Sequence, residues 1–184
     1  CIRDSSKPKS KIIMKILQVY HIYPALFGGV SRVVYDVTRE LAKRGHEASV
    51  LTTEAYLNDE RSNYVIKNLR EVKVYRFKLL SKRLARKNII IPTTKFISWV
   101  RGNVKHYDCI HIHGFRTSLN AILHHYAVKY KIPYVLQAHG SLPRITRWKK
   151  LKQVYDILFG YKLLKNASKV IALNMAEVEQ YRRM

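Results

Sequence analysis

The sequence is poor in cysteine and has no long apolar run. Its two cysteines are Cys1, in a polar leader, and Cys109, in an apolar stretch. A disulfide framework is therefore not expected, and a reducing compartment is favoured. No apolar run approaches the roughly 18–20 residues that a membrane-spanning helix needs. Residues 1–13 are polar and basic without an apolar core, so we interpret them as a disordered leader or expression remnant and not as a secretory signal.

Acidic side chains are also scarce. The chain has 12 Asp and Glu against 35 Lys and Arg, a formal charge of +23 with neutral histidine. Such a surplus attracts nucleic acid, anionic membranes and phosphorylated substrates, although lysine-rich faces also serve only as solvated surface or occur in heat-adapted proteins. The surplus is uneven, because residues 67–105 contain one acid, Glu71, and a second basic patch covers 144–152. The charge therefore favours anionic partners, but it does not decide between nucleic acid, membranes and phosphorylated substrates.

The commonest nucleotide-binding motifs are missing as well. There is no G-x-G-x-x-G fingerprint, no G-K-[ST] phosphate loop and no D-x-D pair. What is present is a globular composition, with 47% apolar and 26% charged residues. In 184 residues this predicts one domain with a sizeable core, which we assign to 14–184.

Strand-like and helix-like patterns alternate along this domain. Apolar, β-branched runs predict strands at 16–20, 48–53, 72–77, 108–113, 133–137 and 169–173. Amphipathic spacing and end signals predict helices at 30–41, 94–104, 118–130 and 148–164, with a last one capped by Asn174 and Glu177. The alternation predicts a Rossmann-like, doubly wound α/β fold with a mostly parallel sheet and helices on both faces. In such folds ligands bind beyond the carboxyl ends of the strands.

The first candidate site follows the first strand. Gly28 and Gly29 lack the Cβ atoms that would keep a ligand away from the backbone, and the next helix turns its free N–H groups toward them. A phosphate or a sugar hydroxyl could bind there, with Ser31 and Arg32 close by. A purely structural Gly-Gly turn is the other interpretation.

Two further candidate sites follow later strands. His111 and His113 alternate on one side of a strand that ends at Gly114. A His-x-His pair can bind a metal only with additional ligands, so hydrogen-bonded histidines are the favoured interpretation. His139, followed by Gly140, ends another strand and projects toward the same edge.

Taken together, these motifs resemble the N-terminal half of a glycosyltransferase family 4 (group 1) enzyme, over about residues 14–184. The segments that carry the resemblance are Pro24 with Gly28-Gly29-Val30, then 41–52, 108–114, 133–140 and 167–174. The resemblance implies a GT-B fold, in which two Rossmann-like domains face each other across a cleft. The C-terminal, donor-binding domain would lie outside this chain.

The resemblance also implies roles for individual residues. Gly28 and Gly29 would contact the donor phosphate and sugar, and His139 would contact the transferring sugar beside Gly140. Ser31 stands where the family often has an acid, and Gln137-Ala138 stand where a Thr or Ser is common. The weaker cleft candidates are Ser31, Arg32, His113, Gly114, Arg116 and Arg144.

The implied reaction is retaining transfer of a sugar from a nucleotide-sugar to a lipid-linked, glycan or other acceptor. Helix-terminal amides and cationic side chains stabilise the departing diphosphate, so neither a metal nor another cofactor is expected. The 184-residue chain alone is expected to be inactive. A nucleotide-sugar epimerase or sugar phosphorylase of the same fold remains an alternative, since the difference lies outside this sequence.

The charge suggests where such a protein works. Residues 81–106 mix basic side chains with apolar ones, and Trp99 could anchor this segment at an anionic membrane surface. We therefore expect a cytoplasmic protein, peripheral on the inner face of the membrane. A nucleic-acid-binding module would also explain the charge, but no recognition signature for DNA or RNA is present.

Overall fold

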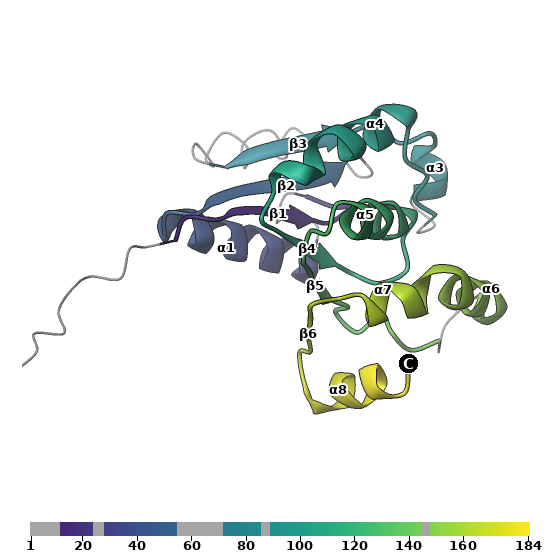
Figure 1. Ribbon diagram of the computed structural model, residues 1–184. Coiled ribbons are helices and arrows are strands. Elements are labelled where there is room, and N and C mark those ends of the chain that lie inside the picture. Colours follow the sequence, from purple (N-terminus) through teal and green to yellow (C-terminus); the bar gives the residue numbers. More distant parts are fainter. Residues whose placement is uncertain (1–11, 24–27, 55–71, 86–88, 145–147) are drawn as a thin grey trace, which may run out of the picture.

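The computed structural model describes residues 12–23, 28–54, 72–85, 89–144 and 148–184. They form a six-stranded sheet in the order β3-β2-β1-β4-β5-β6, and every strand pairing in it is parallel. Helices cover both faces of this sheet (Figure 1). The predicted Rossmann-like, doubly wound α/β fold is therefore confirmed.

The elements follow one another much as the sequence patterns predict. The strands are β1 (Lys15–Val19), β2 (Glu47–Thr53), β3 (Lys73–Phe77), β4 (Cys109–His113), β5 (Tyr134–Gln137) and β6 (Lys169–Ile171). The helical segments are α1 (Gly29–Lys43), α3 (Lys82–Ala85), α4 (Thr94–Asn103), η2 (Val104–His106), α5 (Ser118–Lys129), α6 (Lys149–Tyr155), η3 (Asp156–Gly160), α7 (Tyr161–Lys165) and α8 (Met175–Arg182).

Strand β1 lies at the centre of the sheet, and the chain changes direction there. From β1 it proceeds outward through β2 to β3, and it then returns to place β4 on the other side of β1. A parallel doubly wound sheet leaves a crevice beyond the carboxyl ends of its strands at such a switch point. Here the crevice lies between the segments that follow β1 and β4.

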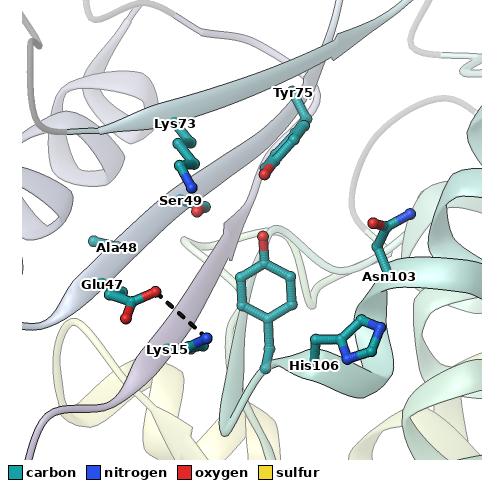
Figure 2. A pocket seen from close by; sticks show the side chains of 9 residues that line it. Lys15, Glu47, Ala48, Ser49, Lys73, Tyr75, Asn103 and His106 are labelled. Atoms are coloured by element: carbon teal, nitrogen blue, oxygen red, sulfur yellow. Dashed lines mark ion pairs between the residues drawn. The ribbon is translucent and has the colours of Figure 1, made fainter.

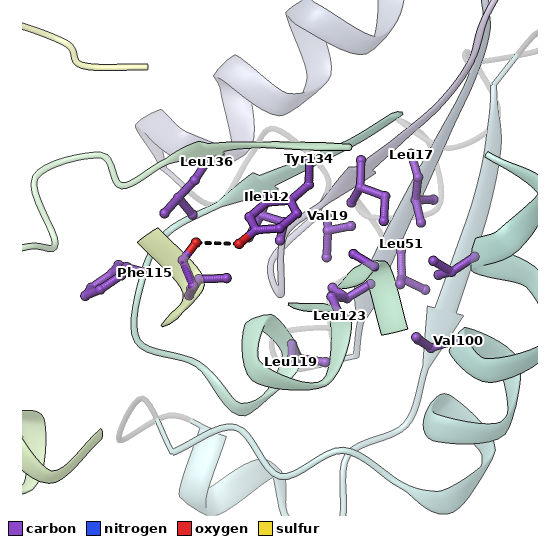
Figure 3. Close-up of a cluster of buried hydrophobic side chains, with 14 of the residues drawn as sticks. Leu17, Val19, Leu51, Val100, Ile112, Phe115, Leu119, Leu123, Tyr134 and Leu136 are labelled. Carbon is purple, nitrogen blue, oxygen red and sulfur yellow. Dashed lines mark hydrogen bonds between the residues drawn. The ribbon is translucent and has the colours of Figure 1, made fainter. Parts of the chain in front are cut away.

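The larger core lies on the sheet face covered by α4, α5 and α7. Side chains at alternate strand positions point into it, and Figure 3 shows Leu17, Val19, Leu51 and Ile112 facing Leu123 of α5. The hydroxyl of Tyr134 donates a hydrogen bond to the carbonyl of Leu163, which fixes α7 against β5. The opposite face carries α1 and a smaller cluster made by Tyr23, Val34 and Val50.

One predicted helix differs in its interior. The helix expected over 148–164 continues to Lys165, but residues Asp156–Gly160 form a π-helical turn between α6 and α7. The side chain of Asp156 is fully buried at this turn. The apolar pattern of the sequence predicts the helix but not its π-helical turn, because the turn depends on the side chains that Asp156 binds.

The segment predicted to contact a membrane has its apolar side chains largely turned inward. Phe96 is fully buried and Ile90 nearly so. Trp99 packs on Tyr75 and Phe77, with ring centroids 4.5 and 5.8 Å apart. Trp99, the side chain expected to anchor residues 81–106 on a membrane, is partly buried against the core. Membrane contact of this segment stays a prediction.

Of the expected leader, residues 1–11 lie outside the described part of the chain. Ile12 and Ile13 are described, and both are exposed. Across the described ranges, none of the helices combines the length and apolarity that crossing a membrane requires.

Candidate functional site

A cleft of about 370 Å³ lies at the carboxyl edge of the sheet, at the switch point. Three chain segments that leave neighbouring strands line it: Tyr20 and His21 after β1, 114–117 after β4, and 138–141 after β5. Val30 of α1 and Lys152 of α6 complete its walls together with Ile90 and Pro143. The cleft is therefore where the sequence predicted ligand binding.

His139 lies on the wall of this cleft and has an unusual backbone. Its φ of 53° is in the left-handed region, as is that of Gly140 at 74°. A residue with a Cβ atom is uncommon there, and strained backbone of this kind clusters at functional sites. The strain is held by hydrogen bonds on both sides of the residue.

A chain of hydrogen bonds connects His139 to the interior of the sheet. Nε2 of His139 lies 2.9 Å from Nδ1 of His113, and Nε2 of His113 lies 2.7 Å from Oε1 of Gln18. Because Oε1 of Gln18 can only accept, His113 donates to it and accepts from His139. A neutral His139 then presents Nδ1 as a hydrogen-bond acceptor. His113, predicted as a cleft residue, is buried beneath the cleft and orients His139.

Burial keeps these imidazoles uncharged near neutral pH. Desolvation lowers the pKa of His113 well below 6.5, and the nearby His111 and His139 lower it further. Desolvation also lowers the pKa of His139, despite the opposing charge of Glu177. The cleft therefore presents a neutral ring at its His139 wall.

His111 lies on the same side of β4 as His113, as predicted, with ring centroids 3.9 Å apart. It is buried, and its Nε2 has no hydrogen-bond partner among the described residues. Burial lowers the pKa of His111 to about 4. Within the described ranges, three or more His, Cys, Asp or Glu side chains are nowhere grouped to hold a metal ion.

Helix α8 fixes the loop that carries His139 and Gly140. The N–H of Gly140 donates to Oε1 of Glu177 at 2.7 Å, and the N–H of Ala138 donates to the hydroxyl of Tyr181 at 2.8 Å. The second oxygen of Glu177 accepts from the N–H of Leu173. The amide of Gly140 is therefore engaged within the protein, and this residue lines the cleft through its backbone position.

Arg116, which lines the cleft, and Arg144 were both predicted to meet substrate, and in the structure both bind Asp156. Arg116 makes two contacts of 2.8 Å to the carboxylate of Asp156, and Arg144 makes one of 2.7 Å. Arg116 also donates to the carbonyls of Ser141 and Leu142. The hydrogen bond to Asp156 raises the pKa of Arg144. This network joins the loops after β4 and β5 to the π turn and holds one wall of the cleft.

The glycines at the start of α1 lie beside the cleft, where Val30 lines it. Gly28 has a φ of 117°, which side chains rarely adopt, and a Cβ atom on either Gly28 or Gly29 would have open space around it. Ser31 is buried and donates to the carbonyl of Ile22 at 3.1 Å. Arg32 pairs with Asp36 at 2.8 Å on the outer side of α1. The structure therefore separates Ser31 and Arg32 from the cleft lining.

Three residues of the site were missed by the sequence analysis. Gln18 lies within an apolar strand pattern, and its pairing with His113 depends on β1 and β4 being neighbours. Glu177 was identified as a helix-start residue: its N–H donates to the N-cap Asn174, and its carboxylate also accepts from the N–H of Gly140. The sequence offered one indication for Asp156, because it is the one acid in the basic and apolar helix predicted over 148–164. An isolated acid in such a helix indicates a buried ion-pair partner.

A second hollow of about 320 Å³ lies at the opposite, amino edge of the sheet (Figure 2). Lys15, Glu47 and Lys73 line it at the beginnings of their strands, and His106 closes one side. Lys15 and Glu47 form an exposed ion pair at 3.7 Å. No sequence motif points to this hollow, and His106 provides a histidine remote from the carboxyl-edge cleft.

Fold and site together define a Rossmann-like domain of the GT-B type, with a cleft at the topological switch point. A profile of Glycosyltransferase Family 4 matches residues 27–184. The chain belongs to this family. No curated protein sequence matches the chain.

Solved structures of one bacterial protein, HepE, share the fold. HepE from Anabaena in complex with UDP-glucose matches 92% of this chain and 40% of its own, with a TM-score of 0.62 and 19% identity. The complex of HepE with UDP gives the same TM-score at 18% identity. MurG from Acinetobacter baumannii matches at a TM-score of 0.49 and 13% identity, over 86% of this chain and 40% of its own. The chain thus spans about 40% of the length of HepE.

Proposed function

We propose that this chain is the acceptor-side domain of a retaining glycosyltransferase that transfers a sugar from a nucleotide-sugar donor. Family 4 membership and the structural likeness to HepE, which was solved with UDP-glucose, support this proposal. The observation that carries it is the placement of His139. Its neutral ring stands at the cleft wall, oriented by His113 and Gln18.

The amino end of α1 supplies one half of the chemistry. As the sugar leaves, negative charge grows on the departing diphosphate, and the free N–H groups at a helix start stabilise such charge. The open space around Gly28 and Gly29 lets a phosphate approach the backbone. The described first turn of α1 has no acidic side chain. No negative charge there competes with a phosphate for the positive end of the helix dipole.

His139 supplies positioning on the sugar side. With Nε2 engaged by His113, its Nδ1 can accept a hydrogen bond from a sugar hydroxyl. Its neutral state avoids placing a cation next to a sugar that gains positive charge in the transition state. The ring is fixed before substrate arrives, so the interaction needs little reorganisation.

We propose further that a donor-binding domain outside these 184 residues completes the cleft. The limited coverage of HepE supports this, since this chain accounts for only 40% of that protein. The 184-residue chain alone should then show no turnover, whereas a protein with both domains should be active. Reading the natural coding sequence beyond the Met184 codon tests whether one gene encodes both.

The first prediction concerns His139→Asn in the protein that contains both domains. Asparagine tolerates left-handed backbone but lacks the ring, so nucleotide-sugar turnover should fall about 100-fold or more while the protein stays folded. Nucleotide release across a panel of UDP- and GDP-sugars measures this, and the configuration of the product anomer by NMR tests retention.

The matched control is His106→Asn, at the amino-edge hollow on the other side of the sheet. It should retain wild-type turnover. Equal activity of the two variants would show that His139 takes no part in the reaction. An inverted product would contradict the retaining mechanism.

A further inference from the structure

A helical surface beside the cleft exposes large apolar side chains. It comprises α6, η3 and the start of α7, and we call it the α6 surface. Its exposed apolar residues are Trp148, Leu151, Val154, Ile157, Leu158, Phe159 and Tyr161. A surface helix normally turns a polar side outward, whereas this stretch also exposes large apolar side chains.

The exposure has a fixed geometry. Asp156, Gly160 and Leu163 are buried and mark the inner side of the helical stretch. Leu151, Val154 and Leu158 follow i, i+3, i+7 spacing and lie on the outer side. The contacts of Asp156 with Arg116 and Arg144 hold the inner side in place. The apolar stripe is therefore presented outward by a helix that is anchored to the domain.

Positive charge surrounds this stripe. Lys149, Lys150 and Lys152 lie at its amino end, and Lys162 and Lys165 at its carboxyl end. The one acid between residues 148 and 165 is Asp156, which is buried and paired with two arginines. An outward apolar stripe with lysines on both sides is complementary to a bilayer that contains anionic lipid.

The segment 81–106, considered from sequence for the same role, lacks this arrangement. Phe96 is fully buried, and Trp99 packs on aromatic core side chains. Trp148, by contrast, is 66% exposed at the start of α6. Of the two tryptophans in the chain, it is therefore the one available at a membrane interface.

We propose that the α6 surface docks the protein on anionic lipid bilayers, with Leu151, Val154 and Leu158 entering the headgroup region and the lysines contacting lipid phosphates. This inference goes beyond the proposed transfer reaction and does not depend on it. Lys152 also lines the cleft, so docking would bring the cleft mouth next to the bilayer.

Flotation with lipid vesicles tests this proposal on the full-length protein. Vesicles of phosphatidylcholine with phosphatidylglycerol are compared with vesicles of phosphatidylcholine alone, at low and high salt. The wild type should float with the anionic vesicles only, and less at high salt. The double variant Leu151→Ser/Leu158→Ser should lose at least about tenfold in apparent affinity, since two apolar side chains no longer enter the interface.

The matched control is Ile97→Ser/Val128→Ser, which removes two exposed apolar side chains from α4 and α5. It should float like the wild type, and equal melting temperatures show that both double variants are folded. Undiminished flotation of the α6-surface variant, or equal flotation on neutral vesicles, would overturn the proposal. So would a wild type that stays in solution and forms dimers that this variant dissociates.

Discussion

At the scale of single residues, His139 and its partners show what a sequence can and cannot predict. The position of His139 at a strand end was predictable, because strand patterns locate the carboxyl edge. Its ring partner was not, since His113 approaches His139 only when β4 and β5 pair. Gln18 likewise approaches His113 only when β4 and β1 pair. The partner that Arg116 and Arg144 share was unpredictable for a similar reason. A buried acid 40 residues beyond Arg116 binds both side chains.

The buried histidines predict a pH dependence of stability. His111 has a pKa of about 4 in the folded protein and about 6.5 when unfolded, so between these values the unfolded chain binds more protons. The free energy of unfolding should fall as the pH falls from 7 to 5, by about 2 kcal/mol from His111 alone. Burial lowers the pKa of His21 to about 4 as well, which adds in the same direction.

Urea unfolding at pH 7 and pH 5 measures this effect, in a range where most carboxylates stay ionised. The variant His111→Phe removes the titrating group and keeps the ring. Its unfolding free energy should depend less steeply on pH than that of the wild type. The same pH dependence in both proteins would show that His111 does not titrate as described.

At the scale of elements, the helical stretch from α6 to α7 has an inner and an outer side with different roles. Its inner side must bind the arginines through Asp156, and its outer side carries the apolar α6 surface. The sequence predicted the helix from its apolar content but assigned no inner and outer side. The π turn at Asp156–Gly160 serves both roles, because it places Asp156 on the inner side.

Gly160 provides a test of this packing. A Cβ atom there would lie 2.9 Å from Oδ1 of Asp156 and 3.1 Å from Cζ of Phe115. Gly160→Ala should therefore destabilise the protein by about 1–3 kcal/mol, although alanine favours helices. Gly102→Ala, in α4 with open space around the new methyl group, should be neutral or stabilising by up to about 1 kcal/mol.

Chemical denaturation of both glycine variants decides between packing and propensity. If helix propensity dominated, both substitutions would stabilise the protein. That result would mean that the turn around Asp156 adjusts freely, and it would weaken the view that the Asp156 network holds the wall of the cleft.

At the scale of the whole molecule, alternation of strands and helices was enough to predict the fold class. Parallel strands are short apolar runs in sequence, and six such runs stood out in this chain. The surface was harder to predict, because the same mixture of basic and apolar residues occurs at 81–106 and at 148–165. Only packing distinguishes them, since Trp99 completes the core and Trp148 remains exposed.

The central claim is that the carboxyl-edge cleft, and not the amino-edge hollow, binds the nucleotide-sugar. Hydrogen exchange of the full-length protein with and without UDP-glucose measures this directly. We predict slower exchange in peptides that cover 28–32, 114–117 and 138–141 when the sugar nucleotide is a substrate, with GDP-mannose as the alternative probe. Protection at Lys15, Glu47 and His106 instead would contradict the account. So would the absence of protection at both edges with a nucleotide-sugar that the protein turns over.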